Sequence, residues 1–148
     1  MADLAEQLTV VLLTHDCAPW LPHTLDRLAE LGLPVVAVDN ASRDGTRELL
    51  AERPFVQLRA LPTNTGAAGR NEGVRAALTP YVAFCDDDGW WERSGLEHAV
   101  RLLEERRFAA WDAARLAGLP PGTAPKYPVP VLPGDPGVHP AAVPTGAG

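Results

Sequence analysis

The stretch LTVVLLT, residues 8–14, decides how this sequence folds. Five of its seven residues are apolar, and such a continuous apolar run is typical of a central strand buried on both faces. Strands buried in this way belong to parallel sheets, in which a helix connects one strand to the next. The following segment carries Leu21, Leu25, Leu28 and Leu31 at helical spacing, so we expect the first connecting helix there.

The same alternation of strand and helix continues along the chain. Further strands are expected at 34–40, 55–61 and 81–85, and further helices at 46–52, 66–78 and 92–106. The run 55–61 alternates apolar and polar residues, which favours a place near the edge of the sheet. The pattern predicts an α/β fold, a mostly parallel open sheet of about four strands with helices on both faces.

The composition changes near residue 119. Nine of the fifteen prolines lie between Pro120 and Pro144, mixed with glycine and alanine and almost without charge. Such a run does not sustain a helix or an interior strand. We therefore predict one folded domain over residues 1–118 and a disordered tail rich in proline and glycine over 119–148.

Charge and hydropathy exclude several classes of partner. A net charge of −6 argues against nucleic acids and anionic membranes as main partners. No apolar run is long enough to span a bilayer, and no secretion signal precedes the first strand, so a cytoplasmic protein is expected. Cys17 and Cys85 lack the spacing of a redox or zinc motif and are expected to be buried, reduced thiols.

Unusual polar residues follow each of the four expected strands. They lie at residues 14–16, 39–40, 64–70 and 86–88, whereas the loops that enter the strands carry no reactive group. In open parallel sheets, ligands bind beyond the carboxyl ends of the strands. The sequence therefore predicts one ligand site at this edge of the sheet.

Three consecutive carboxylates, Asp86 to Asp88, follow the fourth strand. In an extended segment Asp86 and Asp88 would share a face while Asp87 turns away. Two carboxylates held together raise at least one pKa unless a cation compensates, and Mg²⁺ or Mn²⁺ prefers such oxygen ligands. The alternative is an ordinary acidic turn exposed to solvent.

Two further motifs have a functional and a structural interpretation. The glycine-rich run 63–73 opens a helix, where free N–H groups and Arg70 would suit phosphate, or its glycines serve the turn and close helix packing. Asp39 ends a strand, where it can accept hydrogen bonds from a ligand or belong to a helix cap.

Trp90 and Trp91 could form a stacking platform, but core burial of at least one is expected.

Together, residues 8–103 resemble the nucleotide-sugar half of the family 2 glycosyltransferases, which have the glycosyltransferase A-type fold. Four segments carry the resemblance in order: TVVLLTHD, VVAVDNASRDGT, LPTNTGAAGRNEGVRAA and YVAFCDDDGWW. The resemblance implies a nucleotide-diphosphate sugar as donor, Mg²⁺ or Mn²⁺ as cofactor, and an acceptor hydroxyl on a glycan, lipid or small molecule. It also implies inversion at the anomeric carbon.

The resemblance assigns nine residues to the donor site. Asp39 would bind the nucleobase, and the others would serve the ribose, the diphosphate or the metal. Thr14 and His15 would line the base and ribose pocket through their backbone, and Asn64, Gly66 and Arg70 would face the diphosphate. Asp86 would hold the ribose, Asp87 would support the turn beside the donor, and Asp88 would ligate the metal.

The sequence departs from the family pattern after the helix at 92–106. Family members continue with an acceptor-binding region and a catalytic carboxylate, whereas here the next apolar strand is absent. We therefore expect a truncated chain, or one completed by a partner chain, without a catalytic base in a structured segment. The fourth strand would then form an edge open to self-association.

Two other classes of function stay open. The chain could be a non-catalytic nucleotide-binding or interaction module that keeps the fold. A metal-dependent nucleotidyltransferase or phosphohydrolase could use the same carboxylates.

Overall fold

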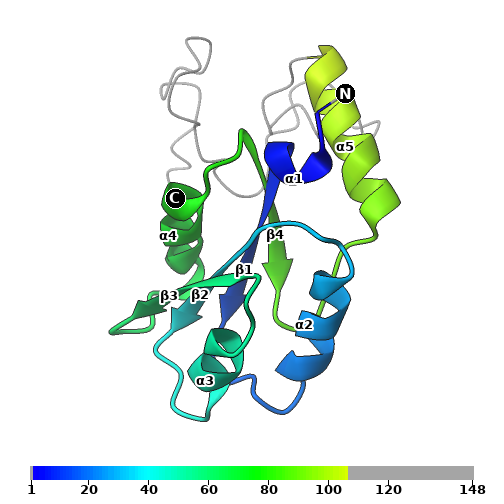
Figure 1. Cartoon of the computed structure of the whole chain (residues 1–148). Coiled ribbons are helices and arrows are strands. Elements are labelled where there is room, and N and C mark those ends of the chain that lie inside the picture. Colours follow the sequence, from blue (N-terminus) through cyan, green and yellow to red (C-terminus); the bar gives the residue numbers. More distant parts are fainter. Residues whose placement is uncertain (1, 107–148) are drawn as a thin grey trace, which may run out of the picture. The chain divides into compact units, whose positions relative to one another are not determined.

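A computed structural model of the chain describes residues 2–106 (Figure 1). The predicted tail over 119–148 and the predicted domain boundary at residue 118 lie outside this range. The chain contacts define two units, Met1–Val100 and Arg101–Gly148, and the first contains the whole sheet. Nine elements precede the last helix: α1 (Leu4–Gln7), β1 (Leu8–Thr14), α2 (Leu21–Ala29), β2 (Val35–Asn40), α3 (Thr46–Ala51), β3 (Val56–Leu61), the 3₁₀ turn η1 (Gly66–Ala68), α4 (Gly69–Ala76) and β4 (Tyr81–Asp86). The last helix is α5 (Arg93–Arg106).

The four strands form one sheet in the order β3-β2-β1-β4, and every pairing is parallel. In the register, Val10 of β1 lies between Val35 of β2 and Ala83 of β4. The α/β prediction is confirmed, and β3 lies at an edge as its alternating pattern indicates. Among residues 2–106, β4 pairs only with β1; association through its other edge stays a prediction.

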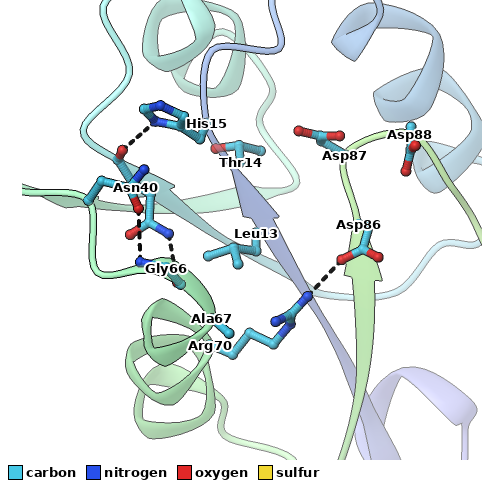
Figure 2. Close-up of a pocket in the computed structure, with 11 residues that line it drawn as sticks. Leu13, Thr14, His15, Asn40, Gly66, Ala67, Arg70, Asp86, Asp87 and Asp88 are labelled. Carbon is cyan, nitrogen blue, oxygen red and sulfur yellow. Dashed lines mark hydrogen bonds and ion pairs between the residues drawn. The ribbon is translucent and has the colours of Figure 1, made fainter.

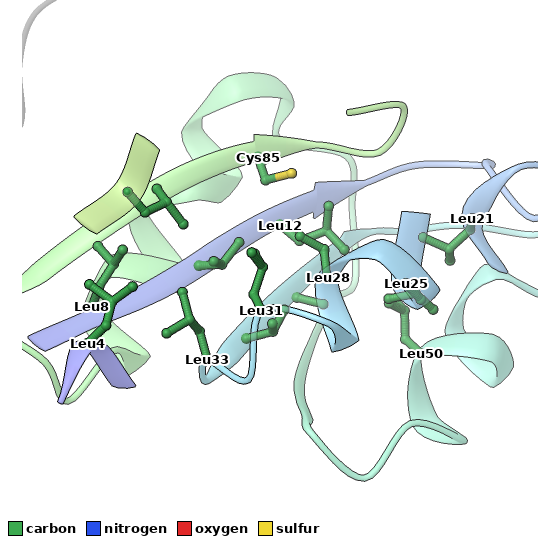
Figure 3. Packing of buried hydrophobic residues seen from close by; sticks show 14 of the residues in the cluster. Leu4, Leu8, Leu12, Leu21, Leu25, Leu28, Leu31, Leu33, Leu50 and Cys85 are labelled. Atoms are coloured by element: carbon green, nitrogen blue, oxygen red, sulfur yellow. The ribbon is translucent and has the colours of Figure 1, made fainter. Parts of the chain in front are cut away.

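Helices cover both faces of the sheet, because alternate residues of the strands point to opposite sides. Leu12 of β1 belongs to the main core, with leucines of α2 and Leu50 of α3 (Figure 3). Val10 of β1 and Leu96 of α5 belong to the same cluster. The odd-numbered residues of β1 point to the opposite face of the sheet, where α4 lies. A side chain added at Gly73 of α4 would come within 2.3 Å of the Val11 Cγ1 atom.

Local chemistry fixes where the helices begin and end. Pro22 stands in the first turn of α2, where its missing N–H costs nothing, and Gly32 ends the segment with a left-handed φ of 64°. The expected helix at 66–78 divides into the 3₁₀ turn η1 and the helix α4. Helix α1 was not expected; the Asp3 carboxylate accepts a hydrogen bond from the Ala5 N–H at its start.

None of the helices in the described range combines the length and the apolar character that crossing a membrane requires.

Candidate functional site

A pocket of about 480 Å³ opens at the carboxyl ends of the strands (Figure 2). Parallel strands end at the same edge of a sheet, so the loops that leave them converge there. The pocket is lined by residues 13–15 at the end of β1, Asn40 at the end of β2, residues 86–88 at the end of β4, and Asn64, residues 66–67 and Arg70 around the start of α4.

Eight of the nine predicted site residues line this pocket. Asp39 is the exception, because its side chain is fully buried beneath the loop that follows β2. Asn40 lines the pocket and was absent from the predicted set. The structure therefore brings the predicted residues together, while their binding to a ligand stays a prediction.

Asp39 is an internal hydrogen-bond acceptor. Its Oδ1 accepts from the Thr14 hydroxyl at 3.0 Å and its Oδ2 from the Arg47 Nε at 2.7 Å, and Ser42 donates both its N–H and its hydroxyl. Burial alone would raise the pKa of this carboxyl, but the hydrogen bonds from Ser42 and Arg47 outweigh it and lower the pKa. A nucleobase would have to displace one of these donors to reach Asp39.

Hydrogen bonds also join the loop after β1 to the loop after β2. The Asp16 N–H donates to the Ser42 hydroxyl at 2.9 Å, and the Arg43 N–H donates to the Asp16 carboxylate at 2.7 Å. Asp16 and Ala41 both have a left-handed backbone, with φ of 44° and 57°. Non-glycine residues rarely adopt this conformation, so the surrounding contacts must hold the two loops in place.

His15 and Thr14 present different groups to the pocket. The His15 Nδ1 donates to the backbone carbonyl of Asn40 at 2.6 Å. The other ring nitrogen, Nε2, lies 3.4 Å from the Asp16 carboxylate. The Thr14 hydroxyl is engaged by Asp39. Thr14 can therefore meet a ligand only through its backbone, as the resemblance implies.

Asn40 connects the end of β2 to the glycine-rich loop. Its Nδ2 donates to the Gly66 carbonyl at 2.9 Å, and its Oδ1 accepts from the Thr65 N–H at 3.2 Å and from the Thr65 hydroxyl at 3.1 Å. Only 3% of Asn40 is exposed. The pairing uses both the donor and the acceptor of the amide, which an aspartate could not reproduce. The sequence signal for this residue was its place beside Asp39 at a strand end.

The glycine-rich loop is shaped by its own hydrogen bonds. The Asn64 Oδ1 accepts the Gly66 N–H at 2.8 Å, so two backbone donors near the helix start, those of Thr65 and Gly66, already have partners. Gly66 has a left-handed φ of 60°. These N–H groups are therefore not free for an anion, and Arg70 is the cationic group that this segment brings to the pocket.

Close packing explains two glycines of α4. A Cβ at Gly69 would lie 2.9 Å from a methyl group of Leu13 and 3.0 Å from the Asn40 Oδ1. At Gly73 the clash with Val11 would be closer still. The packing interpretation of these glycines is thus confirmed, and it brings Arg70 close to the sheet.

The three carboxylates have three different surroundings. Strand β4 ends at Asp86, whose carbonyl accepts the Gly89 N–H at 3.2 Å, so the strand alternation that grouped Asp86 with Asp88 stops there. Asp86 pairs with Arg70, at 2.8 Å between Oδ1 and Nη2. Asp87 instead contacts the start of α2. Its carbonyl accepts the Thr24 hydroxyl at 2.7 Å, and its carboxylate accepts the Nε1 of Trp20, the residue before the helix, at 3.3 Å.

Asp88 is exposed and has no hydrogen-bond or ion-pair partner among residues 2–106. Within the same range, no group of three or more His, Cys, Asp or Glu side chains is arranged to hold a metal ion. A carboxylate without a partner still fits a hard divalent cation that takes its other ligands from phosphate oxygens and water. Asp88 and the neighbouring Asp86 are the residues that would hold such an ion.

Both cysteines are free and buried, as expected. Burial raises the pKa of Cys17 to about 12 and that of Cys85 to about 11, and the nearby aspartates add to both shifts. Neither thiol is a nucleophile at neutral pH.

The expectation that Trp90 or Trp91 is buried in the core is wrong. Trp90 is 41% and Trp91 is 43% exposed. The face of α2 that meets Trp90 is polar: His23 packs edge-on at 5.3 Å between ring centroids, and the Arg27 guanidinium lies 5.5 Å from the ring centroid. Trp91 donates its Nε1 to the Phe84 carbonyl at 2.9 Å. Both indoles thus pack at the surface beside residues 86–89, the carboxylate loop.

The chain belongs to glycosyl transferase family 2, because the sequence model of that family matches residues 9–127. A Bacillus subtilis (strain 168) protein, TuaG, whose name assigns it to teichuronic acid biosynthesis as a glycosyltransferase, is 29% identical over 117 residues. That match covers 74% of this chain and 46% of TuaG.

The fold resembles that of one solved structure from S. aureus. The crystal structure of S. aureus TarS, residues 1–349, superposes with a TM-score of 0.58 at 23% identity, over 68% of this chain and 33% of that chain. The chain thus spans about half the length of TuaG and about a third of the TarS structure. The likeness to TarS concerns the fold alone.

Proposed function

We propose that this chain binds a nucleotide-diphosphate sugar in the pocket at the carboxyl ends of the strands, together with Mg²⁺ or Mn²⁺. One observation carries the proposal: three aspartates and a single arginine line the same pocket in a member of a glycosyltransferase family. Such a pocket repels a diphosphate on its own but accepts a diphosphate that brings a cation.

Each part of the donor would meet a different wall of the pocket. His15 and the backbone of Thr14 would line the base and ribose. The base could contact Asp39 only after one of the groups that donate hydrogen bonds to Asp39 moves away. Arg70, beside Asn64 and Gly66, would bind the diphosphate, because a guanidinium matches phosphate oxygens in a bidentate geometry. Asp88 would hold the cation, and the neighbouring Asp86 would meet the ribose and share the cation with Asp88. When bound, the cation acts as a Lewis acid on the leaving group.

The donor would then be positioned for transfer to an acceptor hydroxyl with inversion. The acceptor oxygen forms a bond to the anomeric carbon as the bond to the diphosphate breaks, the nucleoside diphosphate leaves with the electron pair, and a base takes the hydroxyl proton. The residues of this chain would contribute by holding the leaving group. Arg70 would stabilise the charge that develops on its oxygens.

Calorimetric titration tests the proposal. UDP, GDP and dTDP sugars would each be added with and without Mn²⁺ to the wild type, to Asp88→Ala and to Asp26→Ala. Asp26 is an exposed aspartate on α2 that pairs with Arg53 outside the pocket. We expect binding that requires Mn²⁺, at least tenfold weaker in Asp88→Ala and unchanged in Asp26→Ala. Absence of binding by the wild type under every condition would refute the proposal.

A further inference from the structure

Arg70 and Asp86 bind each other across the pocket, although the proposed function needs each of them for a ligand. Arg70 comes from α4 and Asp86 from the end of β4, on the two sides of β1 (Figure 2). Their ion pair is 2.8 Å long, and the two side chains are 30% and 70% exposed. It joins the pocket's cationic side chain to one of its three carboxylates.

We propose, on the basis of the proposed donor site, that this ion pair makes the pocket selective for a nucleoside diphosphate accompanied by its cation. A diphosphate alone can take Arg70 only by leaving Asp86 without a partner and close to its own negative charge. A cation alone can take Asp86 only by leaving Arg70 without a partner and close to its positive charge. The two ligands together replace both halves of the pair.

The consequence is a coupling between two binding events. Whichever ligand arrives second finds the ion pair already broken, so it binds more tightly, and linkage requires the same factor in both orders. An exposed ion pair contributes at most about 1 kcal/mol, which corresponds to about fivefold in affinity. Because a cation and a diphosphate also attract each other directly, the contribution of the pair must be isolated with variants that break it.

The first measurement uses Mn²⁺ alone, followed by calorimetry. Arg70→Gln releases Asp86, whereas Arg75→Gln removes the same charge from the same helix but disturbs only the exposed pair with Glu72. We expect Arg70→Gln to bind Mn²⁺ about fivefold more tightly than wild type, and Arg75→Gln to match wild type within error. Equal Mn²⁺ affinity in the two variants would overturn the inference.

The second measurement uses UDP, GDP and dTDP in metal-free buffer. Asp86→Asn releases Arg70 for the diphosphate, whereas Asp88→Asn removes one negative charge from a residue that has no partner in the described range. We expect the gain in nucleotide affinity of Asp86→Asn to exceed that of Asp88→Asn by about fivefold. Equal gains would overturn the inference while leaving the proposed donor site intact.

The two proposals fail in different ways. If none of the nucleotides binds the wild type even with Mn²⁺, the donor-site proposal is refuted and with it the selectivity. If a nucleotide binds with Mn²⁺ but the paired variants do not differ, only the role of the ion pair is refuted.

Discussion

Asp39 and Asn40 are neighbours in the sequence, yet their side chains stabilise different parts of the site. Strand alternation sends Asp39 toward α3 and Asn40 toward α4. Asp39 therefore binds Ser42 and Arg47, while Asn40 binds Thr65 and Gly66. The sequence predicted polar residues at this strand end, but which partners they take depends on contacts between segments distant in the chain.

The lowered pKa of Asp39 makes a prediction about acid stability. Between the folded pKa and the ordinary value of 3.8, the unfolded chain binds more protons than the native protein. The contribution of Asp39 is thus fully present above pH 3.8 and is lost as the pH falls through the folded pKa. Asp39→Asn should lower the free energy of unfolding by ~1–3 kcal/mol at pH 7.

Urea unfolding of wild type and Asp39→Asn between pH 7 and pH 2 measures this effect. The difference between the two proteins should stay constant down to about pH 4 and then narrow. Asp44 also has a lowered pKa, so some acid sensitivity should remain in the variant. A difference that widens on acidification would contradict the assignment of Asp39 as a stabilising carboxylate.

Gly73 is a second position where one atom matters. An added Cβ would lie 2.3 Å from the Val11 Cγ1 and 3.2 Å from the Val38 Cγ2, so α4 would have to move away from the sheet. Gly73→Ala should therefore destabilise the fold by ~1–3 kcal/mol, although alanine favours helices. Gly95→Ala in α5 is the matched control, because nothing lies within 4 Å of its added Cβ. Chemical denaturation should find this control neutral or slightly more stable; a neutral Gly73→Ala would show that α4 tolerates the shift.

At the scale of elements, hydrophobic patterning was enough to predict the four strands and their connecting helices. The continuous apolar run of β1 and the alternating run of β3 correspond to a central and an edge strand. The prediction of a buried tryptophan was wrong, because it rested on how often tryptophans are buried in proteins in general. That frequency does not show whether the surface opposite the side chain is apolar. The α2 surface beside Trp90 carries His23 and Arg27, and such a surface does not bury an indole.

Helix α2 holds the carboxylate loop in place, and this contact predicts a local effect. The Thr24 hydroxyl, 2% exposed, donates to the Asp87 carbonyl at 2.7 Å. Thr24→Val keeps the shape but leaves that carbonyl without its donor, which costs ~1 kcal/mol. The loop between β4 and α5 should then open more often.

Amide hydrogen exchange distinguishes a local from a global effect of Thr24→Val. The Gly89 N–H, which donates to the Asp86 carbonyl, should exchange about fivefold faster, the factor that ~1 kcal/mol corresponds to. The Val38 N–H in the centre of β2 should not change. Trp20→Phe, which removes an exposed bond of 3.3 Å to Asp87, should have a smaller effect. Equal acceleration at Gly89 and Val38 would mean that Thr24 supports the whole fold rather than the loop.

At the scale of the whole molecule, the parallel topology of the sheet is enough to predict where the site lies, without knowledge of side-chain contacts. Parallel strands bring the loops at their carboxyl ends to one edge of the sheet, which is why eight of the nine predicted residues line one pocket. Topology does not determine pairings such as Arg70 with Asp86, because these depend on how closely α4 approaches the sheet. That approach is set by Gly69 and Gly73.

The two thiols offer a measurement of how this end of the molecule opens. Cys17 and Cys85 are buried on the α2 side of the sheet, with pKa values raised to about 12 and about 11. At pH 8 the native thiolate fraction is on the order of one part in a thousand or less, so a disulfide reagent should react only with molecules that have opened. Labelling of the native protein should thus be at least about a hundredfold slower than labelling in urea.

Ligand binding should slow that labelling further, because the pocket and both thiols depend on the same strand ends. A nucleoside diphosphate with Mn²⁺ at about 100 times its dissociation constant should slow the reaction about a hundredfold, since only the closed protein binds it. Cys17→Ser isolates the reaction of Cys85, which directly precedes the carboxylates. If a nucleotide shown to bind by calorimetry left this rate unchanged, Cys85 would become exposed by a motion that keeps the pocket intact. The carboxyl ends of β1 and β4 would then not open as one unit.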